Sequence, residues 1–456
     1  MSKINPNIFR AYDVRGTYPE ELNEEAAFKI GKAVVSFLNA KKIVIGEDAR
    51  LSSPSLSHAV RRGVLESGCD IFYAGVSTTP LLYFTVNETN SDGGIMITGS
   101  HIPPDKNGLK IVREESIPIS SNSGLQEIKE IADKNFMFKS GEGLIHDVNF
   151  TKKYIDFLLD KSGFQDEAER DKINKLKIVI DASNGVTPLV LDGLLKYFNF
   201  KFTPLFFEID GSFPNHLSDI SRDENLQELK WKVLKEKADI GIAFDGDGDR
   251  MAVIDNTGEI IRSEYVLSLF FKYGFGRENS LSLQKTVYDH RFSRSVKELF
   301  GERGIRSKTG HSFIKQAMKE NDADIGGEIS GHFFFKEMKY ADSAILAMLK
   351  LLKILDNEKK PIGELIKPFQ KYFYSGEINI EISQDHKKLF EKIRFKYADG
   401  EINELDGVTV EYKNWWFNIR ASNTEPLVRL VVEAESKGLM EEKVKEITSE
   451  IKKSAN

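Results

Sequence analysis

The chain has 456 residues, of which 40% are hydrophobic and 29% charged, the usual balance of a soluble globular protein. Its net charge of −6 argues against a nucleic-acid partner, and no run approaches the roughly 18 apolar residues of a membrane-spanning helix. The N-terminus lacks the apolar core of a signal peptide, and the single cysteine, Cys69, excludes an intrachain disulfide and a cysteine-based zinc site. We therefore expect a cytoplasmic protein with no nucleic-acid or membrane partner.

The first part of the chain alternates helices and strands, which is typical of an α/β unit with a parallel sheet. Residues 23–38 have helical spacing, and Ser53-Pro54 begins a helix in the favoured N-terminal way. The predicted strands are 42–46, 71–74 and 95–97. The polar segment 139–143 predicts a linker to a second unit.

Two further α/β units are predicted after this linker. The second has a helix through Leu159, a helix near 226–234, and strands at 176–181, 204–207 and 240–244. The third begins near Gly258 and has a strand at 286–288 and helices from Ser293 and Ala341. Three successive α/β units of this length suit domains of ordinary size.

The end of the chain has a different pattern. The predicted strands are 373–382, 408–410, 415–419 and 428–433, and the predicted helices are 386–395 and a segment from Leu439. Several strands follow one another without helices between them. This pattern predicts an α+β domain with an antiparallel sheet.

Ser100 and His101 stand where the short apolar strand 95–97 ends. In open α/β sheets, ligands bind at this end of a strand. An ordinary turn is the alternative interpretation of a Gly-Ser pair near prolines. The G-x-S-x-G elbow of esterases is absent, because Ile102 stands where its second glycine would be.

The residues after His101 favour a compact loop. Pro103 and Pro104 exclude a helix or an inner strand. Asn107-Gly108 then predicts a tight turn that returns the chain to Lys110. A hydroxyl, an imidazole and an ammonium group are therefore expected in one small loop.

Asp245, Asp247 and Asp249 alternate with glycines directly after a predicted strand. Carboxylates that converge in this way need a cation, and oxygen ligands select Mg²⁺ or Ca²⁺. An EF-hand is excluded because its sixth position would be Arg250 and its twelfth Asn256. The alternative is a solvated acidic turn.

Glu328, Ser330 and His332 lie in a second glycine-rich loop. A carboxylate two residues from a hydroxyl suits the binding of adjacent sugar hydroxyls, although an ordinary polar loop has the same composition. His332 could act as an acid or base near neutral pH, or be a structural histidine.

The polar stretch 420–429 has the composition of an anion-binding site, or of an ordinary hairpin loop. Its donor residues are Arg420, Ser422, Asn423, Thr424 and Arg429.

Together and in this order, these four stretches resemble the α-D-phosphohexomutase superfamily over essentially the whole chain. The opening residues 9–16 are especially similar to bacterial and archaeal phosphomannomutase/phosphoglucomutase enzymes. Gly248, between the second and third aspartates, fits that branch, whereas phosphoglucosamine mutases typically have alanine there.

The resemblance implies four domains around a central cleft, namely three similar α/β domains with mixed sheets and a C-terminal α+β domain with an antiparallel sheet. Their expected limits are 1–145 for the phosphoserine domain, 146–257 for the metal-binding domain, 258–368 for the sugar-binding domain and 369–456 for the phosphate-binding domain. A monomer and a dimer both stay open.

The resemblance also implies roles for individual residues. Ser100 would carry the phosphoryl group and, with Asp245, Asp247 and Asp249, hold Mg²⁺. Catalytic help near the transferred group would come from Arg15, His101, Lys110 and His332. Contacts to the sugar or its phosphate would come from Tyr12, Arg250, Arg291, Gly310, His311, Glu328, Ser330, Arg420, Ser422, Asn423, Thr424 and Arg429.

The implied activity is the interconversion of hexose 1-phosphate and hexose 6-phosphate, for mannose, glucose or both, through a hexose 1,6-bisphosphate that also activates the enzyme. Phosphoglucosamine mutase, a phosphatase and a non-catalytic sugar-phosphate binding protein are the alternatives. Two departures from the family pattern are relevant to these alternative functions. Ile102 replaces a usual asparagine, and Arg291 replaces a common lysine.

Overall fold

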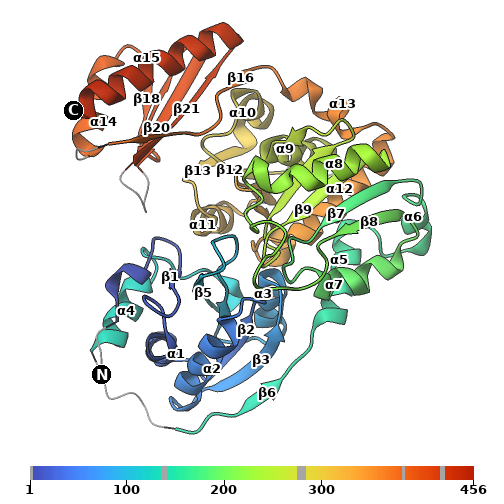
Figure 1. Ribbon diagram of the computed structural model, residues 1–456, viewed down its shortest axis with the longest axis vertical. Coiled ribbons are helices and arrows are strands. Elements are labelled where there is room, and N and C mark those ends of the chain that lie inside the picture. The colour runs from blue at the N-terminus through green and yellow to red at the C-terminus, as the bar shows by residue number, and fades with distance from the viewer. Residues whose placement is uncertain (1–3, 135–140, 275–283, 383–385, 422–426, 456) are drawn as a thin grey trace.

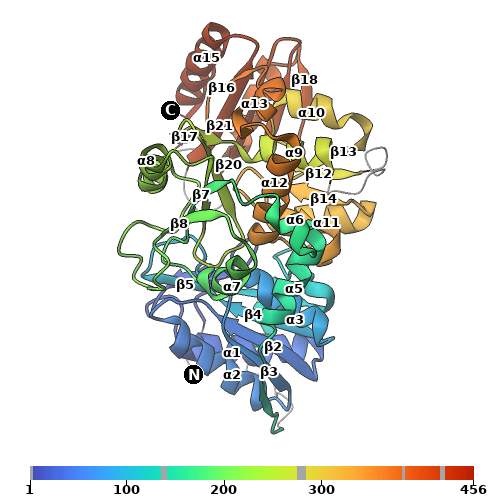
Figure 2. The same ribbon diagram turned by 90° about the vertical axis from the view of Figure 1, so that its right-hand side faces the viewer.

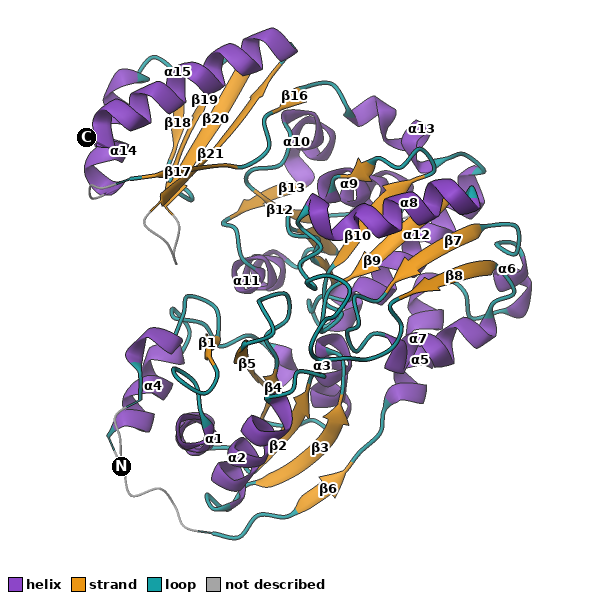
Figure 3. Ribbon diagram, in the orientation of Figure 1, coloured by secondary structure: helices purple, strands orange, loops and turns teal. Residues whose placement is uncertain are grey.

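The computed structural model describes residues 4–134, 141–274, 284–382, 386–421 and 427–455. These residues form three α/β units followed by an α+β unit, as the sequence predicted (Figures 1 and 3). The first and fourth units lie at opposite ends of the molecule, and the second and third lie between them (Figures 1 and 2). Within the described residues, no helix has the length and apolar character needed to cross a membrane.

The first unit contains a mixed sheet in the order β1-β5-β4-β2-β3-β6. Its strands are β1 Val14–Thr17, β2 Lys42–Glu47, β3 Asp70–Val76, β4 Gly93–Ile97, β5 Lys106–Arg113 and β6 Ile145–Asp147. Its helices are α1 Glu24–Leu38, α2 Ser53–Leu65, α3 Thr79–Glu88 and α4 Leu125–Asp133. Strand β4 is buried along its whole length, which explains why it is a continuous apolar run.

The predicted turn at Asn107-Gly108 is wrong, because both residues lie within β5. This strand runs antiparallel to β4 and to β1, and Gly108 is paired with Arg15. A Cβ atom at Gly108 would lie 2.3 Å from the carbonyl oxygen of Val14. The glycine therefore permits the close approach of a neighbouring strand rather than a turn.

The second unit has the sheet order β11-β10-β9-β7-β8, in which β7 is parallel to β8 and β9. Its strands are β7 Lys177–Asp181, β8 Lys201–Leu205, β9 Ile240–Phe244, β10 Met251–Asp255 and β11 Ile260–Ile261. Its helices are α5 Thr151–Ser162, α6 Glu167–Asp171, α7 Pro188–Leu194 and α8 Gln227–Glu236.

The third unit has the sheet order β13-β12-β14-β15, in which the last strand is antiparallel. Its strands are β12 Thr286–Asp289, β13 Gly304–Ser307, β14 Ile325–Gly327 and β15 Phe333–Phe335. Its helices are α9 Ser263–Tyr273, α10 Arg294–Phe300, α11 His311–Asn321, α12 Ala344–Glu358 and α13 Ile362–Ile366. Helix α12 begins after the capping residue Ser343, slightly later than the sequence predicted.

The fourth unit is an antiparallel sheet in the order β16-β21-β20-β19-β18, with β17 also paired to β21. Its strands are β16 Phe373–Tyr374, β17 Ile378–Glu381, β18 Glu401–Asn403, β19 Val408–Glu411, β20 Trp415–Ala421 and β21 Leu427–Ala434. Helices α14 His386–Lys396 and α15 Lys437–Ala455 pack against this sheet (Figure 3). The strand predicted over 373–382 is interrupted at Gly376, which has φ +74°.

One hydrophobic core joins the first three units. Helix α12 is buried almost all round and contacts helices of both the second and the third unit. The fourth unit has a core of its own, in which Leu389 and Ile447 pack under the sheet. The strands β4, β9 and β14, whose ends carry the site loops, therefore belong to units that share a hydrophobic core. The fourth unit has a separate hydrophobic core.

The expected domain limits stay a prediction. The limit between residues 145 and 146 falls inside β6, which pairs with β3 of the first sheet. Strand β11 extends the second sheet past residue 257, the limit expected between the second and third domains.

Cys69 is fully buried just before β3. Burial raises the pKa of its thiol to about 12, which suits an inert structural cysteine.

Candidate active site

The three aspartates converge directly after β9. Asp245, Asp247 and Asp249 are all at most 1% exposed, and each offers an oxygen within 4.8 Å of the others. One carboxylate oxygen of Asp245 accepts the backbone N–H groups of Asp249 and Arg250, both at 3.1 Å, which curls the loop around it. Gly248 has φ +74°, a conformation that glycine adopts without strain.

Ser100 meets this loop from the first unit. Its backbone has φ +51°, and its N–H donates to Thr98 Oγ1 at 2.8 Å. Its hydroxyl donates to Asp245 Oδ2 at 2.8 Å and lies 3.3 Å from His101 Nδ1. A Cβ atom at Gly246 would lie 2.5 Å from the carbonyl oxygen of Ser100. The serine loop and the aspartate loop are therefore in direct backbone contact.

Lys110 reaches the same aspartates from β5. Its ammonium donates to Asp247 Oδ2 at 2.6 Å and also to Asp249, and Thr79 Oγ1 donates to Asp247 Oδ2 at 2.5 Å. Burial alone would lower the pKa of Lys110, but Asp247 and Asp249 outweigh it and hold this pKa well above the usual value. The two carboxylates therefore favour the ammonium form of Lys110.

The aspartate loop fits a hard divalent cation. Its converging donors are carboxylate oxygens, which Mg²⁺ and Ca²⁺ prefer. Among the described residues, Asp247 Oδ1 and Asp249 Oδ1 are buried without a hydrogen-bond partner. Buried charged oxygens of this kind are costly unless a proton or a cation satisfies them.

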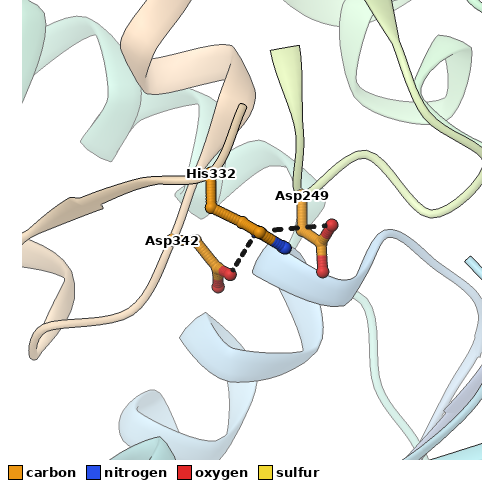
Figure 4. Close-up of side chains that lie close together, drawn as sticks. All are labelled: Asp249, His332 and Asp342. Atoms are coloured by element: carbon orange, nitrogen blue, oxygen red, sulfur yellow. Dashed lines mark ion pairs between the residues drawn. The ribbon is translucent and has the colours of Figure 1, made fainter. Parts of the chain in front are cut away.

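His332 connects the aspartate loop to the third unit. Its Nε2 accepts a hydrogen bond from Arg250 Nε at 3.0 Å, so the neutral ring carries its hydrogen on Nδ1. Figure 4 shows Asp249 and Asp342 on either side of the ring, with Nδ1 3.7 Å from Asp249 and 2.9 Å from Asp342. Burial would raise the pKa of Asp342, but Lys315 and His332 hold it well below the usual value.

Glu328 and Ser330 follow β14 on the same side. Glu328 is 7% exposed, and burial raises the pKa of its carboxyl group. Its Oε2 and the hydroxyl of Ser330 are buried with no hydrogen-bond partner among the described residues. Both groups therefore have unused capacity for a polar ligand.

Tyr12 connects the first unit to the third. Its hydroxyl donates to the carbonyl of Thr309 at 2.9 Å, and its ring centroid lies 5.8 Å from that of His311. A Cβ atom at Gly310 would lie 2.6 Å from the Tyr12 ring. Burial, with the nearby carboxylates of Glu328 and Asp406, raises the pKa of Tyr12 to about 12.

His101 lies beside Ser100, and Arg15 lies on β1, opposite Gly108 of β5. Arg15 pairs with Asp13 at 2.8 Å, and burial together with Arg250 and Arg15 holds the pKa of His101 well below its usual value. These surroundings therefore favour the neutral form of the His101 imidazole next to the serine hydroxyl.

Arginines gather in a second cluster between the third and fourth units. Arg291, Arg420 and Arg429 all donate to the carboxylate of Glu377. Ser422, Asn423 and Thr424, which were expected beside them, lie outside the described residues.

Sequence reasoning missed the residues that fix the serine loop. Arg50 is fully buried, and its guanidinium donates to four carbonyl oxygens of this loop, those of Ser100, Ile102, Pro103 and Lys106, at 2.6–3.0 Å. The partner carboxylate is Asp48, which also accepts the Thr98 hydroxyl at 2.7 Å and the Gly99 N–H at 3.2 Å. From the second unit, the hydroxyl of Ser218 donates to the Ser100 carbonyl at 2.9 Å. Because hydrogen bonds from Arg50 and Ser218 hold these carbonyl oxygens, the serine loop has a fixed conformation before any substrate binds.

Comparison with known proteins agrees with this arrangement. The chain matches the family models described as phosphoglucomutase/phosphomannomutase alpha/beta/alpha domain I over residues 6–138, domain II over 152–258, domain III over 262–372 and the C-terminal domain over 377–450. It is 37% identical to a phosphomannomutase of Methanocaldococcus jannaschii, over 98% of each chain.

Two further relatives are similar over nearly the full length. The chain is 36% identical to a phosphomannomutase/phosphoglucomutase of Pseudomonas aeruginosa, over 95% of this chain and 93% of the other. The solved structure of a phosphoglucomutase/phosphomannomutase family protein from Burkholderia thailandensis superposes with a TM-score of 0.86 at 32% identity, over 98% of each chain. The chain therefore belongs to the phosphoglucomutase/phosphomannomutase family and is a phosphohexomutase.

Proposed function

We propose that this phosphohexomutase interconverts hexose 1-phosphate and hexose 6-phosphate, with mannose, glucose or both as the hexose. The phosphoryl group would be carried by Ser100, and a hexose 1,6-bisphosphate would be both intermediate and activator. The observation that carries this proposal is the Ser100 hydroxyl at 2.8 Å from Asp245, inside a buried cluster of three aspartates. A cytoplasmic location and a monomeric or dimeric state stay predictions.

In the first half of the reaction a sugar hydroxyl oxygen attacks the phosphorus of phosphorylated Ser100. A bond from phosphorus to the sugar oxygen forms, and the bond from phosphorus to Ser100 Oγ breaks. The sugar hydroxyl loses its proton and Ser100 Oγ gains one, so the number of protons in the site is unchanged. In the second half Ser100 Oγ attacks the phosphorus at the other end of the bisphosphate, and the bond from this phosphorus to the sugar oxygen breaks. Ser100 Oγ then loses its proton and the sugar oxygen gains one.

The positions of the neighbouring side chains support roles for them. His101 Nδ1 lies 3.3 Å from Ser100 Oγ, where the neutral ring can take the proton of this oxygen and the protonated ring can return it. Lys110, whose ammonium form is favoured by Asp247 and Asp249, would offset charge on the transferring group. His332 is oriented by Asp342 and Arg250, and Arg15 would serve as a second fixed cation.

Asp245, Asp247 and Asp249 would hold Mg²⁺ together with an oxygen of phosphorylated Ser100. When bound, the ion would neutralise charge on the phosphoryl group during transfer. Substrate contacts would come from Tyr12, Arg250, Arg291, Gly310, His311, Glu328, Ser330, Arg420, Ser422, Asn423, Thr424 and Arg429.

The sugar groups would bind mainly through Glu328 and Ser330. Their unsatisfied atoms, a carboxylate oxygen and a hydroxyl, can respectively accept from and donate to adjacent sugar hydroxyls. The phosphate that is not being transferred would bind at the arginines of the fourth unit. Because either end of the bisphosphate must reach Ser100, this pair of sites has to accept the sugar in two orientations.

The test is to measure initial rates on glucose 1-phosphate, mannose 1-phosphate and glucosamine 1-phosphate, with Mg²⁺ and a trace of glucose 1,6-bisphosphate. We expect conversion to 6-phosphates that disappears in Ser100→Ala and persists in Ser212→Ala, which changes an exposed serine of the second unit. Conversion of glucosamine 1-phosphate alone would identify a phosphoglucosamine mutase instead. Steady release of inorganic phosphate without isomerisation would contradict the proposal and indicate a phosphatase.

A further inference from the structure

Glu377 occupies the centre of the arginine cluster. Its Oε2 accepts from Arg291 Nη1 at 2.7 Å and from Arg420 Nη2 at 3.0 Å, and its Oε1 accepts from Arg429 Nη1 at 3.0 Å. Arg291 belongs to the third unit, whereas Arg420 and Arg429 belong to the fourth. One carboxylate therefore joins guanidinium groups from two units.

The strand register explains why a carboxylate is needed there. Arg420 of β20 and Arg429 of β21 are directly opposite each other in an antiparallel pair. Like charges in this position repel and destabilise the sheet unless an anion lies between them. Glu377 directly precedes β17, whose Ile378 pairs with Leu430, and this pairing places its carboxylate beside Arg429.

The carboxylate is ionised and strongly held. Burial alone would raise the pKa of Glu377, but Arg291, Arg420 and Arg429 outweigh it and lower this pKa below the usual value. Asp289 accepts from the other nitrogens of Arg291, Nε at 3.1 Å and Nη2 at 2.9 Å. Asp289 and Glu377 thus share Arg291, and Glu377 also binds the other two arginines.

The three contacts have the form of a phosphate site. Arginine forks bind carboxylates and phosphates with the same geometry, through charge-assisted hydrogen bonds to oxygen atoms. Among the described residues, the Nε atoms of Arg420 and Arg429 are shielded from solvent and have no hydrogen-bond partner. These arginines therefore have donors left for an anion with more oxygens than a carboxylate.

We propose that Glu377 is an internal anion that competes with the substrate phosphate for Arg420 and Arg429, and so sets the affinity and charge selectivity of this site. The inference rests on the proposed function, in which these arginines bind the phosphate that is not being transferred. A phosphate ester carries a charge of about −1.5 to −2 at neutral pH and offers three acceptor oxygens. A phosphate ester can therefore displace the singly charged carboxylate of Glu377 from these arginines, whereas a singly charged ligand would gain little binding free energy by doing so.

The test is the variant Glu377→Gln, which keeps the size of the side chain and removes its charge. Binding of glucose 6-phosphate and of inorganic phosphate is measured by calorimetry in the full-length chain carrying Ser100→Ala, so that no turnover occurs. We expect binding at least about tenfold tighter than in the parent chain, since the charge-assisted contacts of Glu377 to Arg420 and Arg429 no longer have to be displaced. Glu381→Gln, at an exposed position of β17, the strand that Glu377 precedes, changes the net charge equally and should leave binding unchanged.

Two outcomes separate this inference from the proposed function. Unchanged or weaker binding in Glu377→Gln would show that Glu377 does not compete with the phosphate. A loss of binding in Arg420→Gln in the same experiment would still support the proposed phosphate site. If the parent chain bound neither ligand and Arg420→Gln changed nothing, the competition by Glu377 and the phosphate site of the proposed function would both be wrong.

Thermal unfolding gives an independent readout of the same competition. Without ligand, Glu377→Gln should melt below Glu381→Gln, because the repulsion between the two arginines is exposed. Added inorganic phosphate should raise its melting temperature by more than that of the parent chain. An equal or smaller rise would contradict the inference.

Discussion

Substitution of Arg50 by lysine should loosen the serine loop while the fold persists. The guanidinium donates to the carbonyls of Pro103 at 2.7 Å, Lys106 at 3.0 Å, Ser100 at 3.0 Å and Ile102 at 2.6 Å. A lysine ammonium keeps the charge, but its donors share one nitrogen and cannot match the planar fork. We expect about two of these bonds to be lost.

The size of the effect follows from these bonds. Hydrogen bonds to charged groups contribute about 1.5–3 kcal/mol each, so the local free energy of opening should fall by about 3 kcal/mol or more. This corresponds to a factor on the order of 100 in the population of the open loop. Ser100 would then lose its fixed position opposite Asp245, and activity should fall with it.

Hydrogen exchange measured by mass spectrometry tests this expectation. The amides of Ile102 and Lys106, which are bonded within the loop, should exchange on the order of 100 times faster in Arg50→Lys, whereas peptides from α12 should be unchanged. The matched control is Arg61→Lys in α2, where the guanidinium lies over the Tyr73 ring at 4.3 Å. Loop exchange as slow as in the wild type would refute the reasoning about Arg50.

Further predictions concern pH, the metal and the contact between loops. His216 Nε2 lies 3.1 Å from Asp181, and although burial lowers the pKa of His216, this contact raises it above its usual value. The resulting stability of about 1 kcal/mol should be present below about pH 6.5 and lost as pH rises through the folded-state pKa. The melting temperature of His216→Asn should therefore differ most from wild type at acid pH, and a difference that grew with pH would contradict this. Asp247→Asn should weaken Mg²⁺ binding at least about tenfold in calorimetry, and unchanged affinity would place the ion elsewhere. Gly246→Ala should destabilise the protein by about 1–3 kcal/mol in thermal unfolding, because its methyl group would lie 2.5 Å from the Ser100 carbonyl oxygen. Stability equal to wild type would show that the two loops can separate.

Local sequence patterns predicted most of the elements. The strand that ends before Ser100 and the strand before Asp245 were recognisable because each is a short apolar run followed by glycine and polar residues. The antiparallel fourth sheet was recognisable because its strands follow one another without helices. Such signals come from neighbouring residues, so they need no knowledge of the tertiary fold.

Contacts between distant segments could not be predicted in this way. Asn107-Gly108 has the composition of a turn, but strand β1 packs against Gly108 and Asn107 donates to Ser52 and Ser53. Arg50 binds carbonyl oxygens about fifty residues away, and backbone carbonyls have no sequence signature. Glu377 acquires its importance only through the arginines that the fold places around it.

The central claim is that Ser100 carries the phosphoryl group, and the most direct measurement is a single-turnover chase. The protein is incubated with glucose 1,6-bisphosphate, freed of excess ligand, and mapped by mass spectrometry before and after hexose 6-phosphate is added. We predict one phosphoryl group on Ser100 that moves to the sugar, giving an equal amount of hexose bisphosphate. An unmodified Ser100 in a protein that still isomerises hexose phosphates would contradict the account.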